Sequence, residues 1–253
     1  MRSTRRASSG WAEPRQSSAL AYIEGVNPMS RRSLLAAGLV LAAGCKTTRT
    51  FVGPDGTTAT TVAPGGVLPQ RTPIESVAMV GDSITAASES SLRDALAAVD
   101  IDDVVIDGET SRRVAIGSGR NGQTLSGVRA VKKLLKQGTD PSVWVIALGT
   151  NDVGTFDTPQ DCADLIGEIT VLLPPPVRLE WVNVYRPSDV RQTKVFNQVL
   201  AAQLEVRGDA VVADWYSVAS DPNRDVLRDD NVHPNDAGTV AFAELVVQAL
   251  QRL

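Results

Sequence analysis

SVAMVGDSI, residues 76–84, joins a short apolar run directly to the polar tripeptide Gly81-Asp82-Ser83. The apolar run is typical of a buried strand, and the tripeptide is typical of a turn from a strand into a helix. A serine hydroxyl at such a turn faces backbone N–H groups and the positive end of a helix dipole. Taken alone, the tripeptide fits a helix-capping serine better than a reactive one, so the rest of the chain has to supply partners for Ser83.

Similar apolar runs recur downstream and alternate with amphipathic stretches of helical length. The expected strands are 76–80, 103–106, 143–148, 179–184 and 210–213. The expected helices are 91–98, 124–136, 159–173, 193–206 and 234–250. Repeated strand–helix units with nearly continuous apolar strands predict a five-stranded parallel sheet covered on both faces, which is a three-layer α/β/α sandwich of flavodoxin-like type. One such domain is expected over residues 74–253.

Composition restricts the chemistry that the chain can carry out. The 253 residues have a formal net charge of −4, which gives no basic surface for nucleic acid. Cys45 and Cys162 are the two cysteines and lie in different contexts, so neither a disulfide framework nor a cysteine metal site is expected. Because His233 is the single histidine, any imidazole chemistry must pass through it. The sequence therefore predicts no metal and no cofactor.

Residues 29–45 have the layout of a secretory signal, with a basic start, an apolar run and small residues before Cys45. The apolar run, 34–44, is too short to cross about 30 Å of hydrocarbon as a helix. Arg31-Arg32 and the residues around them resemble a twin-arginine export signal, and 41–45 resembles a bacterial lipobox. Ala42 stands where a lipobox usually has leucine, so a plain cleaved signal is the alternative to lipid on Cys45.

The segments on either side of this signal are expected to lack a packed core. Residues 1–28 are polar and arginine-rich, and we interpret them as an over-extended start, with synthesis beginning at Met29. Residues 46–73 are rich in Thr, Gly and Pro and are predicted to be a flexible linker. With lipid on Cys45, the protein would be held on the outer face of the membrane. We also expect it to be a monomer.

Ligands of open parallel sheets bind beyond the carboxyl ends of the strands, which directs attention to the segments 81–83, 107–111, 149–152 and 229–233. A serine hydroxyl needs an imidazole to take its proton and a carboxylate to orient that imidazole. The spacing of Asp230 and His233 lets the carboxylate reach Nδ1 while Nε2 faces Ser83. Asp229 is the alternative orienting carboxylate. The sequence predicts Ser83 as nucleophile, His233 as base and Asp230 as its partner.

With these residues, the chain resembles the SGNH hydrolases, or GDSL-like lipases and acylhydrolases, over residues 74–253. Gly81-Asp82-Ser83 matches the first sequence block of that family, 149–152 the third (Gly-x-Asn-Asp), and 230–233 the fifth (Asp-x-x-His). The blocks occur in the family's order and follow the expected strands. The resemblance implies the same fold and an ester-cleaving serine enzyme.

The resemblance also implies an oxyanion hole. It would comprise the backbone N–H of Ser83, the side-chain amide of Asn151 and a backbone N–H from the second block, where the family usually has glycine. The chain departs from the family here, because the expected spacing puts Ser111 at the glycine position. Gly108 is the alternative donor.

Charged residues beside these blocks have simpler interpretations. Asp82 and Asp152 are expected to bond backbone groups and fix their turns. Arg112, Arg113 and Arg120 are expected to form a solvated basic loop, with recognition of an anionic substrate as the alternative.

The layout is similar to small SGNH domains related to O-acetyl transfer and deacetylation in the bacterial cell envelope. A domain without an apolar insertion has little to cover a long acyl chain. The predicted function is therefore an exported serine esterase that cleaves short acyl esters, acetyl above all, on small esters or envelope polysaccharide. The alternatives are an O-acyltransferase with the same triad and a catalytically silent envelope-binding protein. A metal-dependent phosphoesterase is disfavoured, because the clusters of His and Asp that it needs do not occur in the sequence.

Overall fold

The computed structural model describes residues 48–52, 58–62, 72–118 and 123–253. The chain divides into two units, Met1–Val67 and Leu68–Leu253. The predicted signal, the predicted start at Met29 and Cys45 lie outside the described residues.

The first unit contains two short strands, β1 (Thr48–Val52) and β2 (Thr58–Val62), which pair antiparallel. No strand was expected in this part of the chain. Both strands are rich in threonine and other β-branched residues, which favour extended backbone. An isolated pair of strands is only marginally stable in water. The role of residues 46–73 as a linker stays a prediction.

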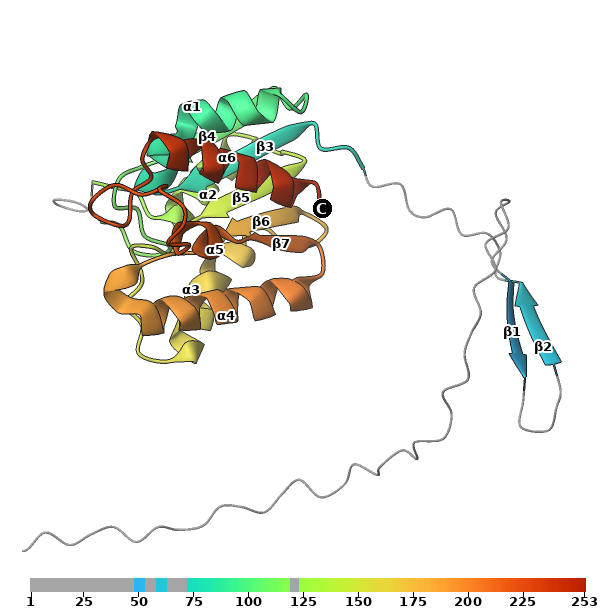
Figure 1. Ribbon diagram of the computed structural model, residues 1–253. Helices are drawn as coiled ribbons and strands as arrows, with labels where there is room; N and C mark the ends of the chain where they lie inside the picture. The colour runs from blue at the N-terminus through green and yellow to red at the C-terminus, as the bar shows by residue number, and fades with distance from the viewer. Residues whose placement is uncertain (1–47, 53–57, 63–71, 119–122) are drawn as a thin grey trace, which may run out of the picture. The chain divides into compact units, whose positions relative to one another are not determined.

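The second unit contains a five-stranded sheet in which every pairing is parallel and the strand order is β4-β3-β5-β6-β7 (Figure 1). The strands are β3 (Ser76–Gly81), β4 (Asp103–Gly108), β5 (Val143–Ala147), β6 (Arg178–Val182) and β7 (Ala210–Ala213). The order reverses direction next to β3, the first strand of the sheet in sequence. Such a switch point is where doubly wound sheets bind their ligands.

Helices cover both faces of the sheet, which confirms the predicted α/β/α sandwich. One face carries α2 (Gly127–Lys136), α3 (Pro159–Thr170) and α4 (Val190–Arg207). The other carries α1 (Ser83–Ala97), α5 (Trp215–Ala219) and α6 (Asp236–Leu250). A 3-10 turn, η2 (Pro187–Asp189), precedes α4. Among the described helices, none combines the length and apolar character needed to span a membrane.

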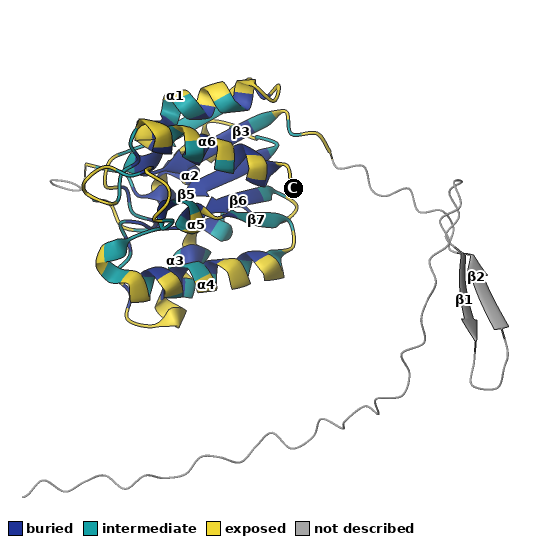
Figure 2. Cartoon of the chain, in the orientation of Figure 1, coloured by how far each residue is buried: buried dark blue, intermediate teal, exposed yellow. Residues whose placement is uncertain are grey.

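Each face of the sheet has its own hydrophobic core, and the sheet separates the two. Trp144 and Trp181 belong to the core beneath α2, α3 and α4, whereas Trp215 belongs to the core beneath α1 and α6. Figure 2 shows the consequence: the inner strands β3, β5 and β6 are mostly buried, the edge strands β4 and β7 are mostly of intermediate burial, and the outer faces of the helices are exposed. A sheet buried on both faces explains why its strands read as continuous apolar runs.

Helix α1 begins at Ser83, well before the expected residue 91. The helix starts here because the Asp82 side chain caps it by accepting a hydrogen bond from the Ile84 backbone N–H at 2.9 Å. Thr85 and Ser88 are fully buried on its inner face, so the first turns bury small polar residues instead of apolar ones. The hydrophobic periodicity used in the sequence analysis therefore did not reach the start of the helix. The short helix α5 was not predicted either.

Candidate active site

Ser83 is the first residue of α1 and lies at the carboxyl end of β3. Asp82, and not Ser83, supplies the N-cap side chain, so the capping interpretation of the serine is wrong. The Ser83 hydroxyl lies 2.9 Å from Nε2 of His233, a residue 150 positions further along the chain. The serine is therefore held between the N-terminus of a helix and an imidazole.

His233 and Asp230 lie in a tight loop before α6. An isolated bridge between Leu227 and Pro234 closes the base of this loop, and Asn231 takes a left-handed φ of 56° that asparagine tolerates. Oδ2 of Asp230 lies 2.7 Å from Nδ1 of His233. The imidazole thus contacts the carboxylate that was preferred from sequence, and Asp229 instead uses its backbone oxygen to accept from Asn231.

The Asp230 carboxylate is stabilised in its ionised form. Its other oxygen, Oδ1, accepts from the backbone N–H groups of His233 and Val232, each at 2.9 Å. The hydrogen bonds from the His233 backbone and side chain, followed by that from Val232, hold the pKa of Asp230 well below its usual value. A carboxylate that stays charged keeps the proton of the imidazole on Nδ1 and leaves Nε2 free to accept the Ser83 proton.

Asn151 is presented by the turn that follows β5. Gly149 opens the turn with a φ of 124°, and a side chain there would meet the Phe196 ring at 2.3 Å, so only glycine fits. The Asn151 amide donates to the backbone oxygen of Arg112 at 3.1 Å and to Oδ2 of Asp82 at 3.3 Å. Asn151 is thereby connected to the residue that precedes Ser83.

Asp82 and Asp152 bond backbone groups, as expected from sequence. Oδ2 of Asp152 accepts from the Val114 N–H at 3.1 Å, and its Oδ1 lies 3.4 Å from Nε of Arg113. Burial raises the pKa of each carboxyl to about 6, against the opposing effect of these donors. Both carboxyls are therefore ionised in mildly alkaline solution, at a cost in stability.

Ser111 has a φ of 60°, in the left-handed region that glycine adopts without strain. Its carbonyl accepts a hydrogen bond from the Ser118 hydroxyl. Gly108 is used differently: a Cβ there would lie 2.6 Å from the backbone nitrogen of Ala86, so its lack of a side chain lets α1 pack closely against β4. The left-handed φ of Ser111 is compatible with the glycine position of the resemblance, and the choice of Ser111 over Gly108 stays a prediction.

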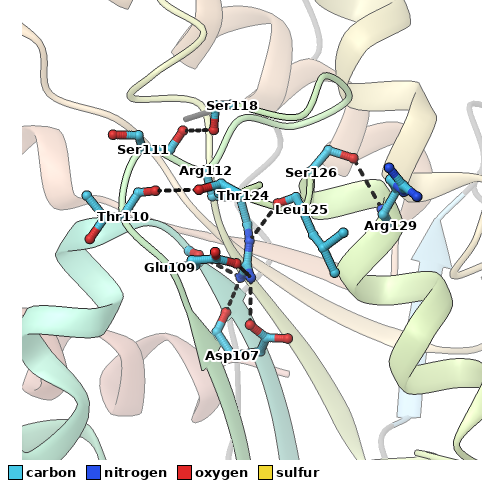
Figure 3. Close-up of polar contacts among 11 residues, drawn as sticks. Asp107, Glu109, Thr110, Ser111, Arg112, Ser118, Thr124, Leu125, Ser126 and Arg129 are labelled. Atoms are coloured by element: carbon cyan, nitrogen blue, oxygen red, sulfur yellow. Dashed lines mark hydrogen bonds and ion pairs between the residues drawn. The ribbon is translucent and has the colours of Figure 1, made fainter. Parts of the chain in front are cut away.

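The expectation of a solvated arginine loop is wrong for Arg112, whose side chain is only 1% exposed. Figure 3 shows its guanidinium enclosed by Asp107, Glu109 and the Leu125 backbone. Arg113 is partly exposed and pairs with Asp152, and Arg120 lies outside the described residues. The neighbouring acids at 107 and 109 were the signal in the sequence that could have revealed a buried ion pair.

The described residues hold no group of His, Cys, Asp and Glu that could bind a metal ion. Cys162 lies fully buried in the core, where burial raises its thiol pKa to about 12. Ser83 and His233 remain the groups at the carboxyl edge of the sheet that the sequence predicted as nucleophile and base, and the structure places them 2.9 Å apart.

A parallel α/β/α sandwich with a serine, a histidine and a carboxylate at this edge has the architecture of the SGNH hydrolases. The model of the GDSL-like lipase/acylhydrolase family matches residues 79–241. The chain therefore belongs to this family. No curated protein sequence matches the chain significantly.

Solved structures of low sequence identity share the fold. The C-terminal catalytic domain of peptidoglycan O-acetyltransferase A from Streptococcus pneumoniae is 19% identical, with a TM-score of 0.53 over 72% of this chain and 95% of that domain. TesA is 21% identical, with a TM-score of 0.54 over 70% of this chain and 98% of TesA. Est24, a carbohydrate acetylesterase from Sinorhizobium meliloti, is 16% identical, with a TM-score of 0.55 over 70% of this chain and 99% of Est24.

Proposed function

We propose that the chain is an exported serine esterase that cleaves short acyl esters, acetyl above all, through an acyl-enzyme on Ser83. The observation that carries this proposal is the continuous contact from the Ser83 hydroxyl to His233 at 2.9 Å and on to Asp230 at 2.7 Å. A hydroxyl, an imidazole and a carboxylate in this order are the parts that nucleophilic acyl transfer requires.

The first half of the reaction forms the acyl-enzyme. Oγ of Ser83 attacks the carbonyl carbon of the ester while Nε2 of His233 takes the hydroxyl proton. The tetrahedral intermediate then collapses, the bond to the alcohol oxygen breaks, and the imidazolium gives its proton to the departing alcohol. Asp230 remains ionised throughout and stabilises the imidazolium. In the second half, Nε2 of His233 removes a proton from water, which attacks the acyl carbon; the bond from that carbon to Oγ of Ser83 then breaks, and the imidazolium returns its proton to Oγ as the acid leaves.

The negative oxygen of the tetrahedral intermediate needs donors that are already in place. We assign them to the backbone N–H groups of Ser83 and Ser111 and the side-chain amide of Asn151. The N–H of Ser83 belongs to the first turn of α1, where the helix leaves such groups free of intrahelical partners. The Asn151 amide donates one hydrogen bond to the Arg112 carbonyl at 3.1 Å and a longer one to Oδ2 of Asp82 at 3.3 Å. To donate to an oxyanion, the amide would exchange its longer hydrogen bond, to Asp82, for one to the developing charge.

The proposed substrate is an acetylated carbohydrate of the cell envelope or a comparably small ester. The side chains of His233 and Asp230 are 35% and 50% exposed, which fits a site that a bulky polymer can approach. The peptidoglycan O-acetyltransferase and the carbohydrate acetylesterase among the structural neighbours support the same substrate class. Export, and lipid on Cys45, rest on the sequence pattern of residues 29–45.

An ester panel tests the proposal. Purified protein would be assayed on aryl esters from acetyl to long acyl chains and on acetylated polysaccharide, each with and without a free carbohydrate acceptor. We expect turnover to be highest for acetyl and to release free acid with or without the acceptor. Acyl products that form only with the acceptor would identify an acyltransferase instead. No turnover on any ester, together with no labelling of Ser83 by a fluorophosphonate, would leave a silent binding protein and overturn the proposal.

A further inference from the structure

Among the arginines of the described residues, Arg112 is the one that is buried as a whole residue, at 1% exposure. It follows Ser111 directly in the loop between β4 and α2. A buried guanidinium is expensive unless each of its donors finds a partner, so its contacts indicate what it holds together.

The guanidinium joins the ends of two strands to the loop beyond them. Nη1 donates to the backbone oxygens of Gly81, at 3.0 Å, and of Asp107. Nη2 bonds the carboxylates of Asp107 at 2.6 Å and Glu109 at 2.9 Å, and Nε donates to the Leu125 oxygen at 3.1 Å (Figure 3). One planar group thus fixes the carboxyl ends of β3 and β4 and the chain just before α2.

The backbone of the same residue reaches the proposed oxyanion donors. The Arg112 carbonyl accepts from the Asn151 amide at 3.1 Å, and its N–H donates to the Glu109 oxygen at 3.2 Å. Ser111, held in its left-handed conformation, lies between these two anchored residues. The Gly81 oxygen that receives the guanidinium belongs to the strand residue just before Asp82 and Ser83.

We propose that Arg112 is a positioning residue for the oxyanion donors: its guanidinium fixes the loop so that the Ser111 N–H and the Asn151 amide point at the developing charge. This inference rests on the proposed esterase function. The three donors lie on different segments, and Arg112 contacts each of them. Its guanidinium bonds Gly81, two residues before Ser83, its carbonyl accepts from Asn151, and its backbone is bonded directly to Ser111. Oxyanion stabilisation depends on donors that are in place before the reaction begins, so a displaced loop lowers kcat more than it weakens substrate binding.

Arg112→Lys is the informative substitution. Lysine keeps the charge but offers three donors on one nitrogen, and it cannot span acceptors on β3, β4 and the loop as the planar fork does. Arg112→Met removes the charge with a side chain of similar length and leaves Asp107 and Glu109 without their partner.

The chain supplies a matched control in Arg207, whose side chain is 7% exposed. It donates to the backbone oxygens of Leu173 and Val177 and lies 2.7 Å from Asp209. These residues precede β6 and β7, so this second arginine clamp lies at the amino edge of the parallel sheet, opposite Ser83. Arg207→Lys and Arg207→Met therefore report the loss of stability that follows when a buried arginine is removed away from the site.

The experiment compares these four variants with the wild-type chain on an acetyl ester, with thermal unfolding measured in parallel. We expect Arg112→Lys to lower kcat by about 10- to 100-fold, up to the range seen when one oxyanion donor is lost, with KM changed by less than about threefold. The Arg207 variants should lose comparable stability and keep kcat within about threefold of wild type. Equal effects of the two arginines on kcat, or failure of both Arg112 variants to fold, would overturn the proposal.

A double-mutant cycle with Asn151→Ala separates positioning from general damage. If Arg112 acts through the amide, then Arg112→Lys costs less kcat in the Asn151→Ala background than in the wild type. Independent, multiplying losses would contradict this coupling. Labelling of wild-type Ser83 by a fluorophosphonate tests the proposed function separately. If the wild type is not labelled and turns over no ester, the esterase proposal is wrong, whatever the Arg112 variants do.

Discussion

Asp152→Asn tests how much the ionisation of one buried carboxyl beside the site lowers the free energy of unfolding. Asp152 is buried with a pKa of about 6, and its side chain accepts from the Val114 N–H. An asparagine at this position can keep an acceptor for that N–H but cannot ionise. The substitution therefore isolates the free energy of charging one buried carboxyl.

The sign and size follow from linkage. A carboxyl whose pKa rises from 3.8 to about 6 on folding holds its proton more tightly in the folded chain, so it lowers the free energy of unfolding as pH rises through this window. A shift of this size corresponds to about 3 kcal/mol when the group is fully ionised. Burial also raises the pKa values of Asp82 and Glu180, which add to the same fall in the wild type. Asp152→Asn should remove the contribution of Asp152 to this pH-dependent loss of stability and leave the contributions of Asp82 and Glu180.

The assay is urea unfolding of wild type and variant at several values from about pH 4 to about pH 8. We expect the stability of Asp152→Asn relative to wild type to rise by about 2 to 3 kcal/mol from the acidic to the alkaline end, because at about pH 4 the unfolded carboxyl is already partly ionised. The pH-independent cost of burying the amide cancels in this comparison. Asp157→Asn, at an exposed position in the loop between β5 and α3, serves as the charge-matched control, measured at the same pH values. A stability difference for Asp152→Asn that does not change with pH would refute the reasoning.

Three further predictions concern the turns that carry the site. Asn151→Ala should lower kcat on an acetyl ester by roughly 10²–10³ with a smaller change in KM, because the amide acts on the developing oxyanion; steady-state kinetics would check it, and a loss confined to KM would make Asn151 a substrate-binding residue. Gly149→Ala should reduce both stability and kcat, since its methyl group would meet the Phe196 ring and displace the turn; unchanged thermal unfolding would contradict this. Ser111→Gly should keep activity within about threefold, because the backbone N–H remains and glycine accepts the same φ; a large loss would mean that the serine side chain takes part.

The sequence predicted the sheet well because the signals were local. Apolar runs bounded by Gly, Asp and Asn identified all five strands of the sandwich, and buried parallel strands are the elements that such runs describe best. The start of α1 was missed because its inner face buries Thr85 and Ser88, which carry no hydrophobic periodicity. The pair β1 and β2 was missed because a Thr-rich segment was interpreted by composition alone.

The site was predicted in part. Ser83, Asp230 and His233 could be named because their chemistry and spacing constrain each other, and the structure brings them within hydrogen-bonding distance. The burial of Arg112 left a weaker signal, the acids at 107 and 109, which the sequence analysis did not use. Its acceptors are mainly backbone oxygens of Gly81, Asp107 and Leu125, and these carry no side-chain signal in the sequence.

The central claim is that Ser83 and His233 act as one proton-transfer unit, and a double-mutant comparison of kcat on an acetyl ester tests it most directly. Ser83→Ala and His233→Ala should each reduce turnover by several orders of magnitude without altering thermal unfolding greatly, and the double variant should be little slower than either single one. Turnover near the wild-type level in Ser83→Ala, or losses that multiply in the double variant, would contradict the account.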